Sequence, residues 1–81
     1  MQGKVDEKRL KRVVLGEWEE YVGWLKRVEE GPEGRVAIFD DAAVVLSGEL
    51  GDLQRHIGKR VGILRTDEAE RPMRMRVILD S

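Results

Sequence analysis

The chain has 81 residues, of which 41% are apolar and 38% are charged, with 15 Lys and Arg residues against 16 Asp and Glu residues. This length supports a single hydrophobic core, and the apolar content together with a net charge of −1 excludes a disordered chain. No apolar run approaches the ~20 residues that cross a bilayer, and the charged N-terminal stretch is unlike a signal peptide. We therefore expect a cytoplasmic protein with no membrane partner.

The chain contains no Cys, which excludes a disulfide framework, a thiolate zinc site and a cysteine nucleophile. A domain this small must then be stabilised by packing, by ion pairs or by a partner. Asn is also absent, and Glu and Arg carry most of the charge. This composition favours a thermophilic source, because ion-pair networks gain value at high temperature.

The charges are unevenly distributed along the chain. Residues 1–16 hold five basic and two acidic residues, residues 17–52 hold three and ten, and residues 53–81 hold seven and four. The simpler interpretation is that both basic ends fold against the acidic middle. The alternative is that the basic ends converge into one patch for a polyanion, although the chain as a whole lacks a strongly basic balance.

Residues 5–15 predict a short N-terminal helix, with a frayed arm as the alternative. Leu10, Val13 and Val14 have the spacing of one helical face, and Gly16 offers a natural stop.

Residues 17–30 fit either a helix or a strand. An apolar stripe at helical spacing runs through them, and a Gly-Pro pair follows as a helix end. The Trp, Tyr and Val content favours a strand, and Gly23 suits a long barrel strand that bends sharply. In a strand Val22 and Trp24 share one face, whereas Tyr21 lies on the other. We predict a strand.

The middle of the chain predicts two strands and a short helix. The strands cover residues 35–39 and 43–46, with an Asp-Asp turn between them. Ser47 then caps a helix that ends at Gly58.

The C-terminal part of the chain predicts two further strands, over residues 60–65 and 73–79, with a polar, acidic loop over 66–72. In the last strand Arg74 and Arg76 alternate with apolar residues and so project from one face.

The predicted order is three strands, a helix and two strands, behind an N-terminal helix. This order resembles the connectivity of the OB fold, a five-stranded Greek-key barrel. We therefore predict a mostly β chain, with an N-terminal helix or arm over residues 1–16 and one small OB-like barrel over residues 17–81. An SH3-like barrel is the near alternative. A helix over 17–30 would give an α+β domain instead.

Nothing in the sequence predicts an enzyme, a metal site or a cofactor. His56 is the single histidine and has no ligand or base partner at a suitable spacing. The acidic residues of the predicted turns and helix start are ordinary solvated or capping groups. The glycines form no phosphate-binding motif. We expect a binding module.

Basic and aromatic residues form the one constellation with functional meaning. On a small barrel they suit single-stranded DNA or RNA, because arginines meet phosphates and aromatic rings stack on bases. The expected phosphate contacts are Lys26, Arg27, Arg60, Arg65, Arg74 and Arg76, and the expected stacking residues are Trp18 and Tyr21.

Two alternatives weigh against that interpretation. In the first, Trp24 belongs to the core and the arginines pair with the surplus acids of residues 17–52 as part of a thermophilic surface. In the second, the chain is a protein-interaction or oligomerisation module with no nucleic-acid activity, which uses the edge strand that residues 72–79 present.

Overall fold

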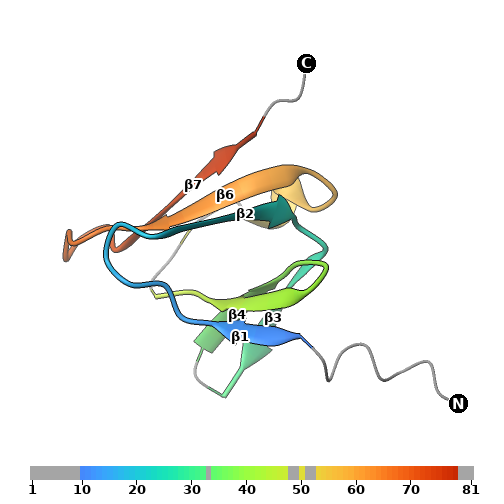
Figure 1. Cartoon of the computed structure of the whole chain (residues 1–81), viewed down its shortest axis with the longest axis horizontal. Coiled ribbons are helices and arrows are strands. Elements are labelled where there is room, and N and C mark those ends of the chain that lie inside the picture. The colour runs from blue at the N-terminus through green and yellow to red at the C-terminus, as the bar shows by residue number, and fades with distance from the viewer. Residues whose placement is uncertain (1–9, 33, 48–49, 51–52, 79–81) are drawn as a thin grey trace, which may run out of the picture.

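The computed structural model describes residues 10–32, 34–47, 50 and 53–78 (Figure 1). The described residues form seven β-strands and one short 3-10 helix, η1. In chain order these are β1 (Lys11–Val13), β2 (Glu20–Trp24), β3 (Arg27–Gly31), β4 (Gly34–Ile38), β5 (Ala42–Val45), η1 (Leu53–His56), β6 (Arg60–Arg65) and β7 (Met73–Val77).

The strands build two sheets that lie in two layers (Figure 1). The four-stranded sheet has the order β1-β5-β4-β3, and the three-stranded sheet has the order β2-β6-β7. All neighbouring strands are antiparallel except β1, which runs parallel to β5.

The core lies between the two sheets, because each strand turns alternate side chains inward. Val61 and Ile63 of β6 are fully buried, as are Ala37 of β4 and Val44 of β5. Leu53 of η1 closes the same cluster at one end.

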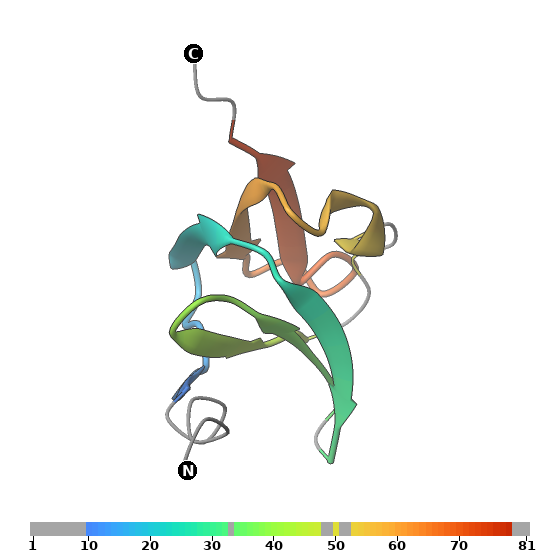
Figure 2. The same ribbon diagram turned by 90° about the vertical axis from the view of Figure 1, so that its right-hand side faces the viewer.

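The chain passes from one sheet to the other at Leu25 and Lys26, and Figure 2 follows this passage from β2 into β3. Leu25 is 1% exposed, and its N–H donates to Lys59 O (3.0 Å) beside the three-stranded sheet. The next N–H, of Lys26, donates to Ile38 O (2.8 Å) in the four-stranded sheet. Adjacent peptide groups therefore anchor the two layers to each other.

The prediction of a mostly β chain is confirmed. The single strand predicted over residues 17–30 is confirmed only in part: residues 17–18 form a turn, and the rest holds two strands, β2 and β3, which lie in different sheets. The α+β alternative is therefore wrong. The described strands do not close into the predicted OB-like or SH3-like barrel but remain two separate sheets. The strand predicted over 60–65 coincides with β6.

The predicted N-terminal helix is wrong over residues 11–13, which form β1; residues 5–9 lie outside the described residues. Burial in this segment alternates from residue to residue, as in a strand and not in a helix. Val13 and Leu15 pack on the core, whereas Val14 between them is exposed. The Lys11 N–H donates to Asp41 O (3.1 Å), so β1 covers the edge of β5. Tertiary pairing here overrides local helix propensity.

The helix predicted from Ser47 to Gly58 is also corrected. Its described part contains only the single 3-10 turn η1, and residues 48–49 and 51–52 lie outside the described residues. Gly58 does follow the turn in a left-handed conformation (φ 92°), as the predicted glycine stop requires.

Gly23 does not mark the bend of the chain, which comes two residues later. It faces inward, where an added Cβ would lie 3.0 Å from Cδ2 of Phe39 and 3.2 Å from Cε1 of Tyr21. The glycine therefore makes room for the Phe39 ring.

We expect Gly23→Ala to lower the free energy of unfolding by about 1–3 kcal/mol, because the methyl group overpacks a filled core. Chemical denaturation measures this loss. The matched control is Gly16→Ala, whose Cβ would meet only the flexible Glu19 carboxylate at 3.3 Å. Equal stabilities of the two variants would contradict this account of Gly23.

Candidate functional site

The three-stranded sheet has one face on the core and one face that no other described element covers (Figure 1). We call the second one the outer face. Its residues alternate with inward-facing ones along each strand; they are exposed on β2 and β7, whereas on β6 the partly buried Arg60 and Leu64 flank the buried Gly62. It consists of Glu20, Val22 and Trp24 of β2, Arg60, Gly62 and Leu64 of β6, and Arg74 and Arg76 of β7.

An ion pair crosses the middle of the outer face. The Arg76 Nε donates to Glu20 Oε2 (2.9 Å) and its Nη2 donates to Glu20 Oε1 (3.1 Å). Because Glu20 is on β2 and Arg76 is on β7, the pair passes over the central strand β6. Gly62 makes this possible: a Cβ there would lie 2.5 Å from Glu20 Oε2.

Gly62 also leaves a hollow in the outer face. The hollow has a volume of about 400 Å³, and its lining combines apolar groups with two guanidinium groups. The lining residues are Glu20, Gly62, Leu64, Arg74, Met75 and Arg76.

Trp24 lies on the outer face, not in the core, and is 49% exposed. It is the direct cross-strand neighbour of Arg60. The alternative in which Trp24 belongs to the core is therefore wrong. The sequence does hold a signal for this position. Trp24 is four residues from Glu20, so both side chains lie on the same face of the strand, and a glutamate marks the solvent face.

The sequence predicts that Tyr21 stacks on a base, but in the structure its ring is not free to do so. Its ring packs on the core against Phe39, with ring centroids 4.8 Å apart and planes inclined at 57°. Its hydroxyl donates to Asp41 Oδ1 (2.8 Å). Burial, and secondarily the hydrogen bond to Asp41, raise the pKa of Tyr21 to about 12.

We expect the single tyrosine to ionise with a pKa near 12 in a spectrophotometric titration. Unfolded tyrosine ionises near 10, and the folded state favours the neutral phenol. The stability contributed by Tyr21 is thus fully present below about pH 10 and is lost as the pH rises toward 12. Titration near 10 in folded protein would contradict a partly buried phenol that is hydrogen-bonded to Asp41.

Three of the six predicted phosphate contacts meet on the outer face: Arg60, Arg74 and Arg76. Lys26 lies between β2 and β3, where the chain crosses from one sheet to the other, and pairs with Asp40 (3.2 Å). Arg27 begins β3 in the four-stranded sheet. Arg27 pairs with Glu29 on the same strand.

Arg65 ends β6 but does not belong to the outer face. One Nη1–H donates to Leu15 O (3.0 Å), and the Nε is buried without a hydrogen-bond partner. Its guanidinium therefore fastens the chain before β2 to the three-stranded sheet.

Trp18 is the other predicted stacking residue and is 58% exposed. It lies in the turn before β2 with a left-handed backbone (φ 67°), a conformation that costs a side chain ~1–2 kcal/mol. Its N–H donates to Arg65 O (2.6 Å), which fixes the turn beside the end of β6.

The ion pairs agree only in part with the interpretation in which both basic ends fold against the acidic middle. Arg76 of the C-terminal part pairs with Glu20 of the middle. Lys26 and Arg35 pair with acids of their own segment, residues 17–52, and Arg74 pairs with Glu68 of its own C-terminal segment. The basic strands β1 and β7 lie in different sheets and so form no shared patch. The strands of the outer face carry three arginines and one glutamate, and Arg74 also pairs with Glu68 of the loop before β7 (2.8 Å).

No helix among the described residues is long and apolar enough to cross a membrane. Within the same residues, the His, Asp and Glu side chains form no group of three placed to hold a metal ion. Comparison with protein-family models, curated proteins and solved structures gave no match to this chain.

Proposed function

We propose that the protein is a binding module for single-stranded nucleic acid, not an enzyme, and that the strand lies across the outer face. Trp24 stacks on a base, while Arg60, Arg74 and Arg76 meet phosphates. The observation that carries the proposal is the half-exposed indole of Trp24 on the same uncovered sheet face as three guanidinium groups.

The shape of the outer face supports this choice. Its central residue is Gly62, and the hollow of about 400 Å³ around it has both apolar and cationic lining. The bases of a nucleic acid need apolar contact, and its phosphate backbone needs positive charge. A single nucleic-acid strand therefore matches both parts of the lining.

The Glu20–Arg76 pair gives the proposal a sharp test. In the free protein the carboxylate occupies the Arg76 fork that a phosphate would take. Glu20→Gln removes that competitor and its negative charge. We expect the affinity for a single-stranded oligonucleotide to rise about threefold to tenfold at low salt, measured by fluorescence anisotropy.

The matched control is Glu30→Gln, which makes the same change in net charge on the four-stranded sheet, where Glu30 pairs with Arg35 (3.4 Å). This control should change the affinity less than twofold, because the site is distant and screened. If Glu20→Gln weakens binding, or if both variants change it equally, the outer face is not the binding surface.

A second candidate function is protein binding or self-association by strand addition at β7, which is an edge strand. Pro72 O and the Ile78 N–H both bond toward β6. By alternation, the N–H and C=O groups of Met73, Met75 and Val77 point away from it. Light scattering at high concentration tests self-association: a mass that stays at 9.3 kDa removes it.

A further inference from the structure

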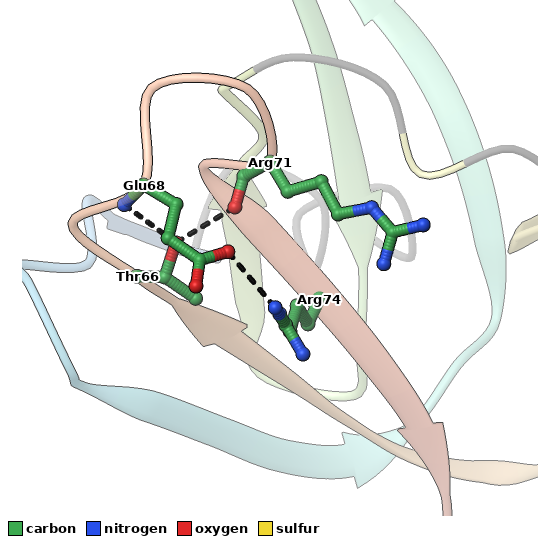
Figure 3. Close-up of polar contacts among 4 residues, drawn as sticks. All are labelled: Thr66, Glu68, Arg71 and Arg74. Carbon is green, nitrogen blue, oxygen red and sulfur yellow. Dashed lines mark hydrogen bonds and ion pairs between the residues drawn. The ribbon is translucent and has the colours of Figure 1, made fainter.

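The loop between β6 and β7 is braced from within (Figure 3). The buried Thr66 hydroxyl donates to Arg71 O (2.7 Å) and accepts from the Glu68 N–H (3.1 Å). The Thr66 N–H also donates to Pro72 O (2.8 Å). These bonds fix where the side chains of Glu68 and Arg71 leave the loop.

The two arginines of this region are in different electrostatic states. The Arg74 Nη2 donates to Glu68 Oε1 (2.8 Å), so one acid already accompanies it. The Arg71 side chain points away from that cluster in Figure 3, and within the described residues no acid pairs with its guanidinium. Arg71 therefore offers a fork of N–H donors that no acid among the described residues occupies.

Arg71 and Arg74 border a second hollow, with a volume of about 430 Å³. Its remaining described lining is apolar: Leu50, Met73 and Met75. This volume lies within the range of small-ligand sites. The site suits a ligand with an apolar or aromatic body and one concentrated negative charge.

The second hollow lies beside the first. Arg74 and Met75 line both of them, at the free edge of β7. A nucleic-acid strand that lies over Gly62 and reaches Arg74 would thus place its terminal nucleotide at the second hollow.

We propose that this second hollow binds the terminal nucleotide of the strand through a terminal phosphomonoester, with Arg71 as the principal phosphate ligand and Arg74 as the second. This inference rests on the proposed function. A terminal monoester carries more negative charge than an internal diester, and a guanidinium fork bonds two of its oxygens at once. The apolar lining takes the attached sugar and base.

The test compares one oligonucleotide sequence in three forms: with a 5′-phosphate, with a 3′-phosphate and with hydroxyls at both ends. We expect one phosphorylated form to bind about tenfold tighter than the hydroxyl form. In Arg71→Ala this advantage should fall below about twofold, while the hydroxyl form keeps its affinity. Arg71→Lys should retain only part of it, because the ammonium lacks the fork.

The matched control is Arg35→Ala, which removes one positive charge from the four-stranded sheet and should keep the full advantage. The advantage should also shrink at pH 5, where the monoester has gained a proton. Equal affinities of all three forms for the intact protein, or an advantage that survives Arg71→Ala, would overturn this inference and leave the proposed function standing. Failure of every form to bind would overturn both.

Discussion

Phe39→Ala is expected to lower the free energy of unfolding by about 3–5 kcal/mol. Phe39 is 1% exposed and follows β4 of the four-stranded sheet, yet its ring packs on Tyr21 and Gly23 of the three-stranded sheet. Its loss opens a cavity at the place where the two layers meet. Because a domain of this size has a stability of roughly 5–15 kcal/mol, the variant should be close to unfolded at moderate denaturant.

Urea denaturation with tryptophan fluorescence measures the loss. Phe39→Leu is the conservative control and should lose less than about 1.5 kcal/mol, because most of the volume is kept. A loss of under about 1 kcal/mol for Phe39→Ala, with an unchanged denaturant dependence, would mean that Phe39 does not hold the sheets together.

Trp24→Ala is expected to weaken binding of a single-stranded oligonucleotide by about 1–3 kcal/mol, which is about 5-fold to 150-fold. The stacking partner is lost while the three arginines remain. The indole is half exposed, so the fold should tolerate the change. Trp24→Phe should restore much of the affinity, because a smaller ring still stacks.

Binding of the Trp24 variants is read by anisotropy, and thermal unfolding checks that both remain folded. An affinity within twofold of the parent in Trp24→Ala would exclude base stacking on this residue. A loss of similar size in Trp24→Phe would point to a shape contact, as in a protein interface, where exposed Trp and Arg residues also dominate.

The elements that the sequence predicts well are those with strong local signals. Residues 60–65 hold a short apolar run with the β-branched Val61 and Ile63, and they coincide with β6. The aromatic and Val content of residues 17–30 indicates extended chain, and β2 and β3 confirm this. The alternation in the last strand places Arg74 and Arg76 together, as the outer face has them.

Long-range pairing accounts for what the sequence does not predict. Local propensity over residues 11–13 favours a helix, but the edge of β5 accepts these residues as a parallel strand. Gly23 has the composition signal of a bend, yet its role is to clear space for Phe39, 16 residues further along the chain. Neither relationship is visible without the partner segment.

The candidate site was predictable in its residue types and only partly in its residues. Alternation separates Tyr21 from Trp24 in β2, and the only local signal of which face meets the solvent is that Trp24 shares its face with Glu20. If the wrong face of β2 is taken as the solvent face, Tyr21 is predicted to stack on a base and Trp24 is predicted to lie in the core. Arg71 has no such signal, because the hydrogen bonds of Thr66 that hold the backbone of this loop join residues that show no periodic pattern.

The most direct measurement is an emission titration of the Trp18→Phe variant, in which Trp24 is the only indole. Adding a single-stranded oligonucleotide should quench the emission to a plateau. Raising the salt should weaken the association with a logarithmic slope near −2, as three phosphate contacts on a single strand release about 0.7 counterions each. Emission that stays constant, or an association constant that ignores salt, would contradict nucleic-acid binding at the outer face.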